Sequence, residues 1–259
     1  MQIFREPRVT VLARQQFLGA PHINWKSDTD VPAQAVAEFA GRICYLSFGP
    51  DAGIEGGHRL VKGRTTNRDY LANILKVRHG SVIEHAVWTV LIEGVSRALT
   101  HELVRHRHLS FSQLSQRYVD ESDVGFVLPP EIEEGTEAFE IWRQSCERSL
   151  EEYRALLARI EEQVKDEPSA TQRRKRARQA ARSVLPNATE TKIVVTGNAR
   201  AWRHVIELRG AEGAEAEIRR LAITLLRVFQ AEAPELFGDY RLVKTESGVE
   251  VIETDFRGV

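Results

Sequence analysis

The chain has 259 residues, is 42% hydrophobic and carries a formal net charge of -1. This length and composition predict a globular protein with a buried core, and the balanced charge provides no overall basic field that would attract nucleic acid. Charged residues and a proline interrupt the first eight positions, and no stretch reaches the ~20 apolar residues of a membrane span, so we expect a cytoplasmic protein without membrane contact.

Hydrophobic spacing and turn residues divide the first part of the chain into short elements. Pro32 suits the first turn of a helix, and apolar residues follow it at helical spacing. Gly80 is expected to end the next helix. The predicted elements are a strand at 9–13, a helix at 32–46, a glycine-rich loop at 49–63, a helix at 71–78 and a buried strand at 86–92.

Helices dominate the second part of the chain. Ser96 is a candidate cap for a helix that points Leu99, Leu103 and Val104 inward and delivers the segment 105–107 at its end. The later elements predicted are helices at 139–164 and 173–182, a strand at 191–196, a turn at 197–198, helices at 199–208 and 218–229, and a hairpin within 240–254. The first of these helices carries a long apolar seam, so it should pack on a partner helix.

Strands and helices follow one another without the regular alternation of a doubly wound sheet. The sequence therefore predicts an α+β fold, with a mixed sheet flanked by helices. No repeat or linker divides the chain, so residues 1–259 are expected to form a single domain.

The segment from Arg105 to Tyr118 is the most informative part of the sequence. It contains three arginines, two histidines and three serines in fourteen residues. Guanidinium groups bind phosphates and carboxylates through two hydrogen bonds at once, and serine hydroxyls donate or accept beside them, so this segment suits an oxygen-rich anion. The order Arg-His-Arg, two residues, Ser, four residues, Ser, one residue, Arg resembles the signature motif of flavin-dependent thymidylate synthases.

Three further blocks resemble the same family, in the same order. Residues 79–85 look like its His-x-[Ser/Thr]-x-x-Glu-His stretch, 181–186 like its Ala-Arg-x-x-Leu-Pro segment, and 198–209 like its Asn-x-Arg and Leu-Arg segment. A helix over the last block puts Arg200 and His204 on one face, behind an N-terminus that favours an anion. Taken alone, that block also fits a charged surface helix with an Asn cap.

Other functions remain open from the residues alone. Arg78-His79-Gly80 resembles the nucleophile loop of histidine phosphatases, although it ends a predicted helix instead of following a first strand. A protein that holds flavin or nucleotide without turnover is a second alternative. The basic segment 173–182 has six cations in ten residues, but acidic residues precede it and no aromatic residues interleave with it, so we interpret it as mostly a solvated face.

The family resemblance implies the reductive methylation of dUMP to dTMP. It implies methylenetetrahydrofolate as the carbon donor, NADPH as the reductant, FAD as the cofactor and a homotetramer with shared active sites. The other class of thymidylate synthase needs a cysteine in a Pro-Cys context, which neither Cys44 nor Cys146 has, so no covalent cysteine chemistry is expected. Their separation also argues against a disulfide framework and a cysteine zinc site, and no metal is predicted.

The resemblance also assigns site residues. The cofactor residues that it implies are Ser81, Arg105, His106, Arg107, Gln113, Asn198, Ala199, Arg200 and His204. The nucleotide residues that it implies are Glu102, Leu103, Val104, Arg105, Gln113, Leu114, Ser115, Gln116, Arg117, Arg182 and Arg209. Arg209 would stabilise negative charge on the uracil ring, and Ser115 would act as a polarising hydrogen-bond donor. Glu102 would contact a sugar or base donor and not the phosphate, and Gln113 occupies a motif position that can be acidic in relatives.

Overall fold

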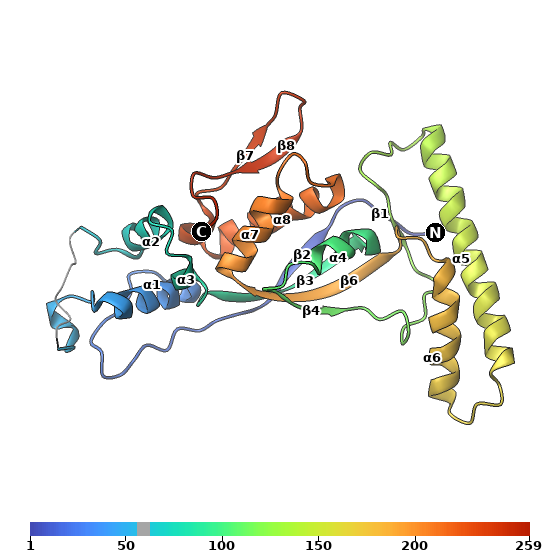
Figure 1. Cartoon of the computed structure of the whole chain (residues 1–259), viewed down its shortest axis with the longest axis horizontal. Helices are drawn as coiled ribbons and strands as arrows, with labels where there is room; N and C mark the ends of the chain where they lie inside the picture. The colour runs from blue at the N-terminus through green and yellow to red at the C-terminus, as the bar shows by residue number, and fades with distance from the viewer. Residues whose placement is uncertain (56–62) are drawn as a thin grey trace. The chain divides into compact units, whose positions relative to one another are not determined.

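A computed structural model describes residues 1–55 and 63–259 (Figure 1). The predicted loop at 49–63 includes residues 56–62, which lie outside the described residues. The helices are α1 (Pro32–Tyr45), α2 (Asn67–Lys76), α3 (Gly80–Ile83), α4 (Arg97–Leu103), α5 (Glu137–Gln163), α6 (Ala170–Ala181), α7 (Ala199–Arg209), α8 (Ala216–Glu232) and α9 (Pro234–Phe237), with 3-10 turns η1 (Pro50–Ala52) and η2 (Arg182–Val184). No helix in the described ranges combines the length and apolar character needed to cross a membrane.

The strands form one four-stranded sheet and two smaller pairs. They are β1 (Ile3–Phe4), β2 (Arg8–Arg14), β3 (Val87–Ser96), β4 (Ser110–Gln113), β5 (Phe126–Val127), β6 (Glu190–Asn198), β7 (Arg241–Lys244) and β8 (Glu250–Glu253). The large sheet has the order β2-β3-β6-β4, β1 pairs in parallel with β5, and β7 pairs antiparallel with β8. This mixture confirms the predicted α+β class, and the β7–β8 pair confirms the predicted hairpin.

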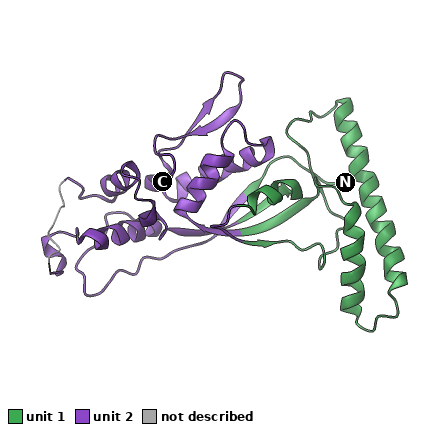
Figure 2. Cartoon of the chain, viewed as in Figure 1, with its two compact units in different colours: residues 1–8, 91–105, 111–194 green, residues 9–90, 106–110, 195–259 purple. Residues whose placement is uncertain are grey.

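The chain divides into two compact units (Figure 2). Unit 1 contains residues 1–8, 91–105 and 111–194, and unit 2 contains residues 9–90, 106–110 and 195–259. Strands β3 and β6 contribute residues to both units. The single domain that the sequence predicts stays a prediction.

In unit 1, the long helix α5 lies beside α6 (Figure 1). Tyr153 and Leu157 of α5 are buried in one cluster with Ala177 and Ala181 of α6. The two alanines have small side chains, which let the helices approach closely and bury the phenol ring. The predicted partner for the apolar seam is therefore a helix of the same chain.

In unit 2, aromatic rings form much of the core that supports α7. Trp202 of α7 packs against Phe229 of α8 with ring centroids 5.0 Å apart, and Trp88 of β3 meets Phe229 at 5.5 Å and Phe237 at 6.0 Å. The indole Nε1 of Trp202 donates to the Gly197 carbonyl at 3.1 Å, so its polar atom is satisfied inside the core. These contacts leave the opposite side of α7 for polar residues.

Several local predictions were wrong. Gly80 does not end a helix; it begins α3, while α2 stops at Lys76 and Arg78 takes a left-handed conformation with φ 58°. The predicted turn at 197–198 is the end of β6, because Asn198 keeps extended backbone and caps α7. Val104 is exposed and not inward, because α4 ends one residue before it.

Candidate functional site

In unit 2, the predicted cofactor residues gather along α7. His106 is 7% exposed, and its Nε2 accepts a hydrogen bond from Arg209 Nε at 3.1 Å. Its ring also meets the ring of His204 edge to face, with centroids 5.6 Å apart. The structure thus brings His106 to two residues of α7 that follow it by about 100 positions in the sequence.

The surroundings of His106 keep its imidazole neutral. Burial, followed by the positive charges of Arg209 and His204, lowers the pKa of His106 from its ordinary value of 6.5 to about 4. Because Nε2 accepts from a guanidinium, the ring hydrogen must be carried by Nδ1. His106 therefore adds no positive charge at neutral pH, whereas its neighbour Arg107 is exposed and charged.

The N-terminus of α7 is capped as well as positively polarised. The Asn198 side chain accepts from Ala201 N at 2.8 Å, and the Ala86 carbonyl accepts from Ala199 N at 2.8 Å. Residues 198–209 therefore fit both sequence-based interpretations in part. Asn198 is an N-cap, and Arg200 and His204 lie on one face of the helix beyond it. An anion at this helix end would depend on the Arg200 side chain more than on free backbone donors.

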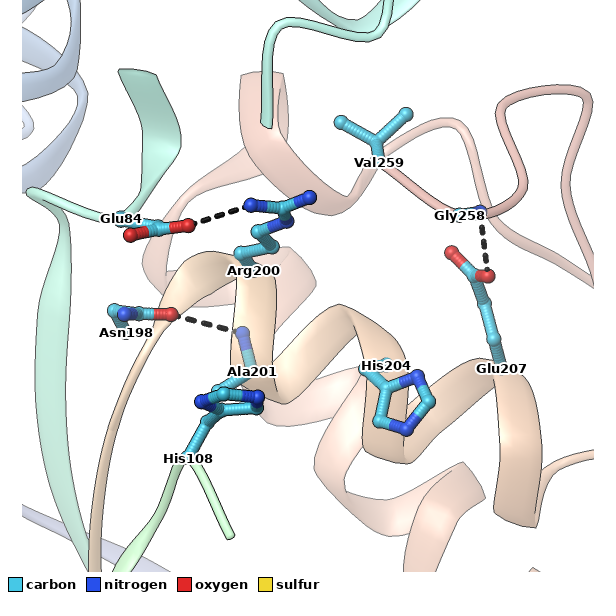
Figure 3. A pocket seen from close by; sticks show the side chains of 9 residues that line it. All are labelled: Glu84, His108, Asn198, Arg200, Ala201, His204, Glu207, Gly258 and Val259. Atoms are coloured by element: carbon cyan, nitrogen blue, oxygen red, sulfur yellow. Dashed lines mark hydrogen bonds and ion pairs between the residues drawn. The ribbon is translucent and has the colours of Figure 1, made fainter. Parts of the chain in front are cut away.

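A cavity of about 420 Å³ lies beside this face of α7 (Figure 3). Its lining residues, all in unit 2, are Glu84, His108, Asn198, Arg200, Ala201, His204, Glu207, Gly258 and Val259. Arg200 Nη1 pairs with Glu84 Oε1 at 2.6 Å, so the guanidinium is held at the wall of the cavity. Sequence reasoning missed His108, Glu207 and the segment at 258–259, although His108 belongs to the signature motif.

Ser81 lies at the exposed surface of α3, one residue from the start of that helix. The structure therefore brings most of the predicted cofactor residues of unit 2 to α7 and leaves Ser81 and Arg107 exposed. Arg105 and Gln113, which are also predicted for the cofactor, belong to unit 1.

In unit 1, four of the predicted nucleotide residues, at 114–117, follow β4, and the others lie at the end of α4 and just after it (102–105), at the end of β4 (Gln113) and in η2 (Arg182). Arg209, also predicted for the nucleotide, belongs to unit 2. Leu114 N donates to the Lys192 carbonyl at 2.9 Å, which continues the pairing of this segment with β6. The chain then turns, since the Ser115 carbonyl accepts from Tyr118 N at 3.1 Å and Val119 N at 3.0 Å. This turn presents 115–117 as a short polar loop.

Two buried hydrogen-bond donors in this loop lack acceptors among the described residues. Gln116 is 5% exposed, yet within residues 1–55 and 63–259 its Nε2 has no hydrogen-bond partner, and the buried Nε of Arg117 has none there either. A buried donor without an acceptor costs about 1–3 kcal/mol, so such atoms normally meet a ligand or water. An oxygen-rich anion would satisfy both.

Unlike these donors, Gln113 and Glu102 have hydrogen-bond partners within the chain. The Gln113 amide donates to Thr100 Oγ1 at 3.0 Å and Thr191 Oγ1 at 3.3 Å, so it connects α4 to β6. Glu102 is half-buried near the end of α4, and its carbonyl accepts from Arg105 N at 3.2 Å. Their roles toward flavin or nucleotide stay predictions.

Arg97 was missed by sequence reasoning. It begins α4, and its buried Nη1 has no hydrogen-bond partner. Burial lowers its pKa, the nearby Glu121 raises it, and the positive charge of Arg182 lowers it. Arg97 therefore lies near both the carboxyl group of Glu121 and the cation Arg182, and its Nη1, unpartnered among the described residues, can donate to an anionic ligand. No sequence spacing could indicate this arrangement, because it depends on the fold.

Much of the basic segment at 173–182 interacts with its own chain. Arg173 Nη1 donates to the Glu167 carbonyl at 2.6 Å, Arg178 Nη1 donates to the Tyr118 carbonyl at 2.6 Å, and Arg176 pairs with Glu167 at 3.4 Å. These contacts hold the start of α6 and the loop beyond the nucleotide residues. They give Arg173, Arg176 and Arg178 structural contacts within unit 1.

Known proteins resemble this chain over nearly its whole length. A flavin-dependent thymidylate synthase of Mycolicibacterium vanbaalenii is 49% identical over 244 residues, and one of Mycobacterium tuberculosis is 47% identical over 244 residues, each covering 94% of both chains. The family model described as thymidylate synthase complementing protein matches residues 28–235. The chain belongs to the flavin-dependent thymidylate synthase family. This family membership does not favour a histidine phosphatase at Arg78-His79-Gly80.

A solved structure supports the fold of this family member. A UMP/dUMP methylase, PolB, from Streptomyces cacaoi, solved with 5-Br dUMP, matches with a TM-score of 0.64 over 92% of this chain and 96% of that one. The two sequences are 21% identical, so the likeness extends to the fold alone.

The buried Glu121 gives unit 1 an unusual pH dependence. Glu121 is 2% exposed, and burial raises its pKa from 4.5 to about 7. The folded state therefore binds more protons than the unfolded state between these values, and stability falls as pH rises from 4.5 to 7. In the wild type, the free energy of unfolding measured with urea should be about 2 kcal/mol lower at pH 8 than at pH 5 because of this group. We predict that Glu121→Gln removes this difference.

Glu152→Gln is the matched control, because Glu152 is an exposed glutamate of the same unit. This variant should keep the pH dependence of the wild-type protein. An unchanged pH dependence in Glu121→Gln would contradict the assignment.

Proposed function

We propose that this protein converts dUMP to dTMP by reductive methylation, with methylenetetrahydrofolate as the carbon donor and NADPH as the reductant, using FAD. The methylene carbon replaces the hydrogen on carbon 5 of uracil, and two electrons from NADPH reduce it to a methyl group. The observation that carries the proposal is the combination of family membership with two polar clusters, one in each unit.

The cluster in unit 2 fits an anionic, aromatic cofactor. Arg200 supplies a fixed cation at the cavity wall, and the imidazoles of His108 and His204 supply ring faces and hydrogen-bonding nitrogens. FAD, when bound, supplies the capacity to accept hydride from NADPH and pass the two electrons on. In our proposal Arg107 and Arg200 hold its anionic groups, and His106, kept neutral, orients the segment around them.

The cluster in unit 1 fits a nucleotide monophosphate. The unpaired donors of Gln116 and Arg117, together with the cations Arg97 and Arg182, suit the doubly charged phosphate. Ser115 lies in the same loop, half-buried, where its hydroxyl can donate to the nucleotide. We assign the phosphate to these side chains.

Arg209 is the residue that we assign to the chemical step. Its guanidinium is fixed on one side by His106 Nε2, so its charge is held in place before the substrate arrives. A fixed positive charge at the uracil edge stabilises the negative charge that develops when carbon 5 acts as a nucleophile. This role rests on the family resemblance, and the hydrogen bond to His106 supports it by showing how the side chain is oriented.

Assembly and compartment are further parts of the proposal. A homotetramer with shared sites rests on the family resemblance alone, because the seam of α5 is already covered by α6 of the same chain. We place the reaction in the cytoplasm, where the free thiols of Cys44 and Cys146 would stay reduced.

Tritium release from dUMP labelled at carbon 5 tests the proposed reaction. Release should require NADPH, methylenetetrahydrofolate and FAD together, because each supplies a different part of the methyl group or its electrons. Omission of each addition in turn is the control. Flavin binding without any tritium release would contradict the reaction and leave a flavin-binding protein.

Two arginine substitutions test the division of roles. Arg209→Ala should lower turnover by about 10²–10³-fold while FAD still binds, because the lost charge acts mainly in the transition state. Arg107→Ala should instead weaken FAD retention, measured by the flavin absorbance that survives gel filtration. The reverse pattern would contradict both assignments.

A further inference from the structure

Residues 254–259, which follow β8 and which we call the arm, border the cavity of unit 2. Gly258 and Val259 line this cavity, and Val259 is only 3% exposed (Figure 3). Both residues lie outside residues 28–235, which the family model matches. The arm is therefore a part of the cavity wall without an assigned role.

Two carboxylates hold the arm in place. Glu207 Oε2 accepts from Gly258 N at 2.9 Å, and Asp239 accepts from the Thr254 hydroxyl. Asp239 is itself fixed by the fully buried Arg203, whose Nη1 and Nη2 donate to its two oxygens at 2.6 and 2.9 Å. The arm is thus connected to the core of unit 2 at both of its ends.

The arm also lies close to Arg200, the cation of the cavity. A Cβ atom built on Gly80 would come within 2.8 Å of Arg200 Nε and 2.9 Å of the Val259 main-chain carbon. The Arg200 guanidinium and the arm therefore converge on the same point of the α3 backbone, which only glycine leaves open. A shift of the arm would free space around Arg200 and loosen its orientation.

Glu207 presents an apparent conflict, because a carboxylate lines a cavity that we assign to an anionic cofactor. Both of its oxygens are occupied within the chain: Oε1 accepts from the Tyr240 hydroxyl at 2.6 Å, and Oε2 accepts from Gly258 N. These donors direct the negative charge toward the chain and away from a ligand. The position of the Glu207 carboxylate is therefore better explained by its hydrogen bond to the arm than by contact with the cofactor.

We propose that the arm is one wall of the flavin site and that Glu207 is the residue that positions it. The inference rests on the proposed function, because it takes FAD as the occupant of the cavity. Glu207 acts through Gly258 and Val259, which keep Arg200 aimed into the cavity. It is a positioning residue and does not touch the reacting atoms.

The test compares FAD affinity of the whole protein by flavin fluorescence titration after flavin removal. Glu207→Ala loses the Gly258 contact and should bind FAD about tenfold more weakly, the size expected for one lost hydrogen bond to a charged group. Glu207→Gln keeps a carbonyl oxygen for Gly258 and should restore most of the affinity. Tyr240→Phe removes the other hydrogen bond of Glu207 and the 3.5 Å contact with the Arg203 carbonyl but leaves Gly258 N bonded to Glu207, so it should bind FAD like the wild type.

A second variant leaves the hydrogen bond between Glu207 and Gly258 unchanged. Val259→Asp places a negative charge on the wall and should weaken FAD binding about tenfold or more; because Val259 is buried, FAD affinity is compared at a temperature where the melting curve shows the variant to be folded. Equal FAD affinity in the wild type, Glu207→Ala and Val259→Asp would overturn the inference. Equal weakening in Glu207→Ala and Tyr240→Phe would overturn the positioning role. Absence of FAD binding by the wild type would contradict the proposed function itself.

Discussion

The guanidinium of Arg209 and the imidazole of His106 meet at 3.1 Å, and this contact decides how the Arg-His-Arg segment lies on α7. It is possible only because His106 is neutral, since a protonated imidazole would have no lone pair to offer and would repel the arginine. Burial of His106 thus fixes both a side-chain orientation and a charge state. The segment that follows it is anchored by Leu109, whose buried side chain lies against Gly197.

The two clusters are built by the same local device. In unit 1, β3 ends at Ser96, whose hydroxyl caps α4 by accepting from Leu99 N at 3.0 Å. In unit 2, β6 ends at Asn198, whose side chain caps α7. Each cap turns an extended chain directly into a helix, so polar residues at the helix start and end are placed by rigid elements.

Local signals explain what the sequence could predict. The caps Ser96 and Asn198 and the apolar seam of α5 act over a few residues, so their helices were expected correctly. The site residues that the signature motif implies stay predictions. Sequence spacing could not indicate the Arg97–Arg182 neighbourhood or the arm at 254–259, because each depends on contacts between distant segments. Gly80 misled the prediction for a similar reason: glycine is needed there because Arg200 approaches the backbone, and not to stop a helix.

The most direct test of this account is an NMR titration of His106 in the wild-type protein and in Arg209→Ala. The account predicts a pKa of about 4 in the wild type, with the proton on Nδ1, and a higher pKa in the variant, where the repulsion by Arg209 is gone although burial, the larger cause, still lowers the value. Arg107→Ala serves as the control and should leave the pKa unchanged. A wild-type His106 that titrates near its ordinary value of 6.5 would contradict the buried, neutral imidazole on which the arrangement of the site depends.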